Sequence, residues 1–297
     1  MDFKEELQTY QSIINNELQK YLRKEQGLEE VLHQSMEYSL MAGGKRLRPI
    51  LVLATYSLLK DTVYEKCFPY AVAIEMVHNF SLIHDDLPGI DNDDFRHGKP
   101  TNHKKFNEAT AILAGDALLN NAYIVISNDL IKSSGNSEIS AKLQVFNEFS
   151  AAIDKMIAGE YVDTEFEGKN ISIEDLKYIH ENKTGALLTL CVRMGAILAN
   201  ATPEDLQNLT EYSQKIGLAF QVKDDILSEE GDEKELGKPV GNDKERNKCT
   251  YVSKYGLDGA KNILNELIKQ AINCLDKYGE KAEFLKNLAE YIRDRKK

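Results

Sequence analysis

The sequence predicts an all-α fold, with about ten or more helices in a single domain over residues 1–297. No segment sustains a period-two alternation, and no Asn-Gly or Asp-Gly pair joins two β-rich runs. Helical signals occur along the whole chain. The six prolines all suit helix boundaries or one aspartate-rich turn. No low-complexity linker divides the chain, which favours one domain.

Both ends of the chain show the spacing of an amphipathic helix. The apolar positions near the start of the chain are Leu7, Ile13, Ile14 and Leu18. Those near its end are Phe284, Leu285, Leu288 and Ile292. Two internal helices have recognisable starts. Thr202 and Pro203 supply a cap and a first-turn proline, followed by two acids. Ser172 to Asp175 resembles a capping box.

Composition narrows the function classes. The net charge of -11 argues against general nucleic-acid binding, although a local basic patch suits a small anion. We find no signal peptide and no long uncharged apolar span, and therefore expect a cytoplasmic protein without stable membrane insertion. The scattered cysteines lack metal spacing and are interpreted as reduced. They are Cys67, Cys191, Cys249 and Cys274.

The most informative stretch runs from Ser81 to Pro100. It follows the apolar run 70–83 and holds five aspartates, Asp85, Asp86, Asp91, Asp93 and Asp94. So many carboxylates repel one another unless a cation lies between them. Mg²⁺ suits such a site, because it takes one or two carboxylates together with waters and substrate phosphate oxygens. The alternative is an acidic solvated loop, which the apolar lead disfavours.

The spacing of the aspartates predicts a break in the helix. On a regular helix the direction of Asp91 is rotated by about 240° from that of Asp85, or about 120° by the shorter way, so the two cannot share an ion. Pro88 and Gly89 lie between them, and proline kinks or ends a helix. We therefore expect an irregular turn over residues 87–90 that brings Asp91 back towards Asp85.

The segment Phe220 to Ser228 repeats the same order, in which apolar residues come before an Asp-Asp pair that begins at Asp224. Gln221, Asp224 and Ser228 share one helix face. Two such segments are able to offer carboxylates to one metal cluster, or they are unrelated helix ends.

Cations and a histidine stand in unusual places. Lys45 and Arg48 follow two glycines at a helix start, where positive charge opposes the macrodipole and favours an anion site. Lys183 lies on an apolar stripe, so it snorkels or meets an anion. Lys238, in Gly-Lys-Pro-Val-Gly, signals only a turn, and His78 alone reads as a core histidine.

Taken together and in this order, these motifs resemble the trans-isoprenyl diphosphate synthases, and within them the bacterial farnesyl diphosphate synthases. The resemblance covers nearly the whole chain. It rests on Gly43–Pro49, the aspartate-rich stretch 81–101, Leu113–Leu119, Lys183–Gly185, Phe220–Asp225 and Leu236–Gly241. The family implies mostly antiparallel helices around a deep central cavity, isopentenyl and allylic diphosphates as substrates, and a homodimer.

The resemblance also implies residue roles. Three Mg²⁺ ions, with Mn²⁺ as an alternative, would be held by Asp85, Asp86, Asp91 and Asp224. The allylic diphosphate would meet Arg96, Lys183, Thr184, Gln221 and Lys238. Isopentenyl diphosphate would meet Lys45, Arg48, His78 and His97. The allylic C–O bond would then ionise, the isopentenyl double bond would attack, and the departing diphosphate would accept the proton.

Product length depends on the depth of the cavity. Phe80 lies about 7.5 Å along a helix from Asp85. With Ser81 beside it, it would floor the cavity early, as a bulky aromatic does in the family. We expect farnesyl diphosphate from dimethylallyl or geranyl diphosphate, with geranyl or geranylgeranyl diphosphate as alternative products.

Three positions depart from the family pattern: His97 replaces an arginine, Ser228 replaces an aspartate, and Glu160 replaces a glutamine. Two other functions therefore stay open. A class I terpene cyclase needs no second diphosphate site, which Lys45, Arg48 and His78 argue against. A non-catalytic partner subunit of a prenyl synthase draws slight support from Ser228 and His97.

Overall fold

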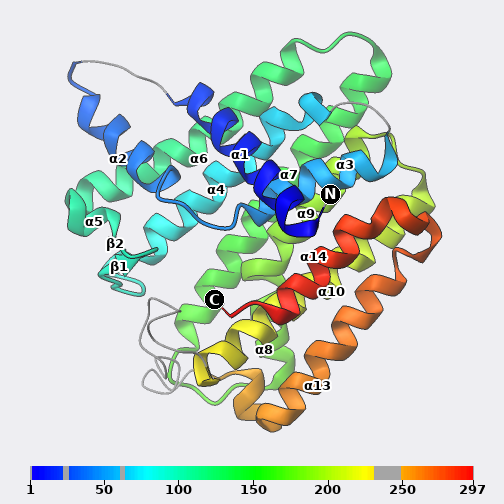
Figure 1. Ribbon diagram of the computed structural model, residues 1–297. Coiled ribbons are helices and arrows are strands. Elements are labelled where there is room, and N and C mark those ends of the chain that lie inside the picture. The colour runs from blue at the N-terminus through cyan, green and yellow to red at the C-terminus, as the bar shows by residue number, and fades with distance from the viewer. Residues whose placement is uncertain (1, 23–26, 61–63, 231–248, 297) are drawn as a thin grey trace. The chain divides into compact units, whose positions relative to one another are not determined.

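The computed structural model describes residues 2–22, 27–60, 64–230 and 249–296 (Figure 1). Helices dominate this part of the chain, which confirms the predicted all-α class. The first half contains α1 (Phe3–Tyr21), α2 (Glu30–Leu40), α3 (Leu47–Leu59), η1 (Tyr64–Cys67), α4 (Phe68–Asp85), β1 (Phe95–Arg96), β2 (Lys99–Pro100), α5 (Asn102–Lys105) and α6 (Glu108–Ile131). The second contains α7 (Asn136–Glu165), α8 (Ile173–Ile179), η2 (His180–Gly185), α9 (Ala186–Leu198), α10 (Pro203–Glu230), α13 (Tyr251–Asn273), η3 (Asp276–Ala282) and α14 (Glu283–Asp294).

The chain divides into two compact units. Met1–Leu53 with Thr62–Leu143 forms unit 1, and Ala54–Asp61 with Gln144–Lys297 forms unit 2. The prediction of one domain over residues 1–297 stays a prediction.

Unit 1 is built on α4, whose residues between Tyr70 and Phe80 are almost all buried. Figure 1 shows α4 and α6 running side by side, and α1 and α2 also pack on α4. Close packing of α6 is possible because its buried face carries small residues, among them Ala111, Ala114 and Gly115. In the described part of the chain, α6 alone has the length and apolar composition of a membrane span, criteria that a packed core helix also meets.

Unit 2 is organised around α10, which packs along α9, α13 and α14 (Figure 1). The fully buried Tyr212 ties α10 to α14, because its hydroxyl donates to the carbonyl of Leu285 at 2.7 Å. The final helix buries Leu285, Leu288 and Ile292 on one side, as the sequence predicts.

Both predicted internal helix starts are confirmed. Asp175 and Asp205 donate their backbone N–H groups to the hydroxyls of Ser172 and Thr202, at 3.0 and 3.1 Å. The short hairpin of β1 and β2 was not predicted. His97 and Gly98 turn it with φ of 52° and 74°, values that suit a tight hairpin.

A buried ion pair fixes the segment before α3. Arg46 adopts a left-handed φ of 55°, which turns its side chain into unit 1. Its guanidinium donates to Glu75 at 2.6 Å, to the Leu40 carbonyl at 2.7 Å and to Asn15 at 3.0 Å. Both charged side chains are nearly inaccessible, so removing one leaves a buried charge without its counter-ion.

We therefore predict that Arg46→Met lowers the free energy of unfolding by about 3–5 kcal/mol, measured by urea denaturation. Arg293→Met is the matched control, because its partly exposed pair with Asp294 contributes about 1 kcal/mol or less. The double variant Arg46→Met with Glu75→Leu should recover most of the loss. Equal costs for the two single arginine variants would contradict this role for Arg46.

Candidate functional site

The predicted turn after α4 is present. The helix ends at Asp85, and the N–H of Asp91 donates to the Asp85 carbonyl at 2.8 Å. Two further bonds close the turn, from Ile90 and Asn92 to the Leu87 carbonyl at 2.9 and 3.0 Å. The backbones of the two aspartates thus lie together at the carboxyl end of a helix, where the macrodipole disfavours anions and favours a bound cation.

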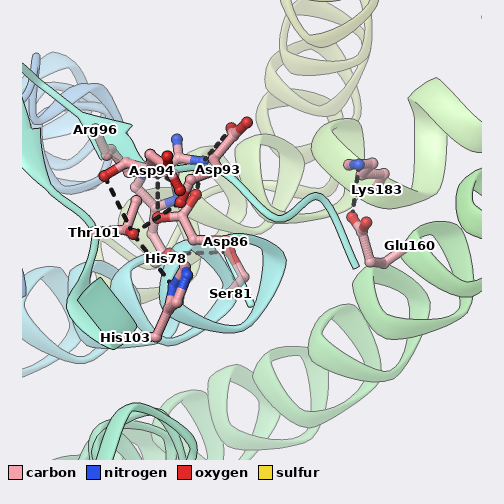
Figure 2. A network of polar contacts seen from close by, with 10 residues as sticks. All are labelled: His78, Ser81, Asp86, Asp93, Asp94, Arg96, Thr101, His103, Glu160 and Lys183. Atoms are coloured by element: carbon pink, nitrogen blue, oxygen red, sulfur yellow. Dashed lines mark hydrogen bonds and ion pairs between the residues drawn. The ribbon is translucent and has the colours of Figure 1, made fainter. Parts of the chain in front are cut away.

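Asp86 takes a different place from its neighbour. It is 3% exposed, and both of its oxygens accept hydrogen bonds from Arg96 at 2.5–3.0 Å (Figure 2). Burial opposes the charge of Arg96, but the bonds to Asp86 and its negative charge outweigh it and raise the arginine pKa. The pair therefore anchors β1, and with it His97, against the end of α4.

The loop beyond is held by short polar contacts. The Thr101 hydroxyl donates to the Asp93 carbonyl at 2.8 Å (Figure 2), and Asp94 pairs with Lys104 at the same distance. A small cavity of about 30 Å³ opens beside this loop, lined in part by Asp86 and Arg96.

Most of the residues predicted to bind isopentenyl diphosphate come together within unit 1. Arg48 Nη1 lies 3.2 Å from His78 Nε2. Burial and the positive charge of Arg48 lower the pKa of His78 well below its usual value, so its ring is neutral near pH 7. His97 lies beside Gly44, where an added Cβ would be 3.6 Å from its Nε2. Lys45 follows directly, and its carbonyl accepts from Gln11.

The two residues predicted to floor the cavity lie one turn before the aspartates. Phe80 is buried and meets the His84 ring edge-on, with centroids 4.9 Å apart. The Ser81 hydroxyl donates to the His78 carbonyl. His84 is pressed against Gly115, where a Cβ would come within 2.2 Å of its ring. A glycine at position 115 is therefore required for α4 to bring His84 this close to α6.

The two aspartates of the second pair contact different parts of unit 2. Asp224 forms an ion pair with Arg295, whose guanidinium also stacks on Phe220 and donates to the Phe220 carbonyl at 3.0 Å. The buried Asp225 instead accepts the N–H of Tyr251 at 2.7 Å, which holds the first turn of α13. Gln221 donates to Asp224 at 3.3 Å, as their shared helix face predicts. Ser228 is partly exposed on the same helix.

Lys183 and Thr184 belong to η2, a π-helical turn between α8 and α9. Such turns are rare and occur often at functional sites. The ammonium of Lys183 lies 2.7 Å from Glu160 (Figure 2) and 2.7 Å from Asp163, so it meets anions, which was one of the two alternatives predicted for it. Thr184 is buried.

Among the described residues, no three His, Cys, Asp or Glu side chains converge to form a ready-made metal cage. Mg²⁺ usually binds through one or two carboxylates and completes its shell with waters and substrate phosphates. Asp85 and Asp91 carry hard oxygen donors of this kind. Lys238 lies outside the described residues, so its predicted role stays a prediction.

The roles of Arg46 and Arg295 were not predicted from the sequence. Arg46 had a readable signal, because Glu75 is an acid within an apolar helix and requires a partner. Arg295 had none, since Asp224 lies 71 residues earlier.

The chain is similar to known proteins in both sequence and structure. Residues 29–288 match the family model described as polyprenyl synthetase. The farnesyl diphosphate synthase of Bacillus subtilis is 44% identical, covering 94% of this chain and 93% of its own. The farnesyl diphosphate synthase of Micrococcus luteus is 41% identical, covering 96% of each. The crystal structure of geranylgeranyl pyrophosphate synthetase from Pyrococcus horikoshii aligns with a TM-score of 0.88 at 28% identity, over 99% of this chain and 100% of that one.

We predict that His180 makes the stability of the fold sensitive to acid. This residue lies in η2, and its ring stacks on that of Tyr251 in α13. Burial lowers its pKa to about 4, with Asp163 opposing and Lys183 reinforcing the shift. Because the unfolded ring binds a proton more readily, this stability is present above pH 6.5 and lost as pH falls. The expected loss between about pH 7.5 and pH 5 is about 2 kcal/mol.

The measurement is urea unfolding at both pH values for the native chain, for His180→Phe, which keeps the stack without titrating, and for the control His33→Gln. Between these pH values the free energy of unfolding of His180→Phe should fall by about 2 kcal/mol less than that of the native chain. Identical pH dependence in all three chains would contradict the assignment.

Proposed function

The chain belongs to the polyprenyl synthetase family, and on that premise we propose that its aspartate-rich segments bind the metal ions and allylic diphosphate of a prenyl transfer. It is a short-chain trans-prenyltransferase that condenses isopentenyl diphosphate with an allylic diphosphate, and its main product is farnesyl diphosphate. The observation that carries the proposed site is the turn joining the Asp91 N–H to the Asp85 carbonyl.

Ionisation of the allylic C–O bond places negative charge on the leaving diphosphate, which must be stabilised where it develops. Magnesium ions, when bound, supply that stabilisation as Lewis acids. We propose that Asp85, Asp91 and Asp224 hold three such ions, with Mn²⁺ as a substitute. Asp86 follows Asp85 in the chain and orients Arg96 through its bidentate bonds.

Cations of the chain add to this stabilisation. We assign the remaining allylic diphosphate contacts to Arg96, Lys183, Thr184, Gln221 and Lys238. The ion pair of Arg96 with Asp86 supplies support, because it holds this cation in place before a substrate arrives. Such preorganisation reduces the reorganisation required during the reaction.

The second substrate is assigned to unit 1. Lys45, Arg48, His78 and His97 form the proposed isopentenyl diphosphate site. The neutral His78 ring beside Arg48 supports this, because it is able to donate a hydrogen bond to a phosphate oxygen while Arg48 supplies charge. His97 stands where the family pattern has an arginine, so the proposed site has one permanent cation fewer.

The remaining parts of the proposal concern the whole molecule. We propose a homodimer in the cytoplasm, without stable membrane insertion, in which residues 1–297 act as one catalytic domain.

Incubation of the purified chain with labelled isopentenyl diphosphate, Mg²⁺ and each allylic starter tests the function. Farnesyl diphosphate should dominate from dimethylallyl and geranyl diphosphates. No turnover by the chain alone, with turnover restored by another subunit, would contradict the enzyme assignment.

Phe80→Ala should lengthen the products, because truncation of this buried ring deepens the space behind Asp85. We expect geranylgeranyl diphosphate and longer chains by product sizing. Phe149→Ala removes an equally buried ring from unit 2 and serves as the control for general loss of packing. Unchanged product length in Phe80→Ala would exclude Phe80 as the floor.

A further inference from the structure

Lys183 is held by two carboxylates rather than one. Its ammonium lies 2.7 Å from Glu160 Oε2 and 2.7 Å from Asp163 Oδ2. Glu160 and Asp163 are three residues apart on α7, so they project from the same face of that helix. All three side chains are about one-fifth exposed, which leaves their charges only partly screened by water.

The backbone keeps this cluster together. A Cβ at Gly159 would lie 2.3 Å from the backbone nitrogen of Lys183, so α7 and η2 are in direct contact there. The lysine main chain is thus packed one residue from Glu160, and only its side chain is able to swing from the carboxylates to another anion.

Glu160 brings a second carboxylate to the ammonium of Lys183. Asp163 contacts the same ammonium at the same distance, so carboxylates occupy positions around a lysine that is assigned to a diphosphate. His180, in the same turn, adds no positive charge near neutral pH, because burial lowers the pKa of its ring. A carboxylate and a diphosphate that meet one ammonium repel each other, and like charges brought together oppose binding.

We propose that Glu160 sets the affinity of this chain for the diphosphate group by competing with it for the Lys183 ammonium. The proposal rests on the function assigned above to Lys183. Each arriving diphosphate must draw the ammonium away from Glu160, and the same carboxylate recaptures it as the product diphosphate leaves. Glu160 is thus a specificity-determining residue that weakens retention of diphosphate and favours its release.

The test is calorimetric binding of inorganic diphosphate, with Mg²⁺ in excess, to the native chain and to Glu160→Gln, which keeps the shape and removes the charge. We expect the Kd of Glu160→Gln to fall about fivefold or more. The KM for the allylic diphosphate should fall in parallel, and the KM for isopentenyl diphosphate should stay unchanged. Glu165→Gln, an exposed carboxylate at the end of the same helix, is the matched control and should bind like the native chain.

Two further variants separate charge from structure. Glu160→Asp retains the charge and should restore a Kd near the native value, whereas Asp163→Asn removes the other carboxylate and should tighten binding in the same direction as Glu160→Gln. A Kd for Glu160→Gln within about twofold of the native value, in a native chain that binds diphosphate and turns over, overturns this inference alone. A native chain that neither binds diphosphate nor forms prenyl products overturns the proposed function as well.

Discussion

Charges expected to meet a metal ion or a diphosphate already have opposite charges beside them. Asp86 is clamped by Arg96, Asp224 meets Arg295, and Lys183 lies between two carboxylates. Each pair is formed within its own unit. An unpaired ion that is largely buried, as Asp86 is, costs several kcal/mol, so the contact with Arg96 is what allows Asp86 to remain packed. Ligand binding is then an exchange of counter-ions rather than a capture by bare charges.

The need for a nearby counter-ion or hydrogen-bond partner also gives the neighbours of the proposed ligands definite structural roles. Arg46 is buried on Glu75, whereas Lys45 and Arg48 of the same motif are assigned to the proposed isopentenyl diphosphate site. Asp225 holds the start of α13, whereas Asp224 at the surface of α10 is assigned to the proposed metal site. In each case adjacent residues of like charge divide into one that anchors a helix and one assigned to a ligand.

Local signals made much of this predictable. Pro88 and Gly89 break the helix where the spacing of Asp85 and Asp91 demands it, and the caps at Ser172 and Thr202 lie within four residues of the groups they satisfy. Long-range pairs were not predictable from one sequence. Nothing local shows that Arg46 turns inward through a left-handed φ, or that Arg295 returns to Asp224. The hairpin at His97 escaped notice because its strands are two residues long.

The most direct test of this account is a crystal structure of the chain with Mg²⁺ and a non-hydrolysable allylic diphosphate analogue. We predict metal ions on Asp85, Asp91 and Asp224 that share a single diphosphate, with Asp224 released from Arg295. Metal ions on the first aspartate segment only, with the Asp224–Arg295 pair intact beside a bound diphosphate, would contradict it.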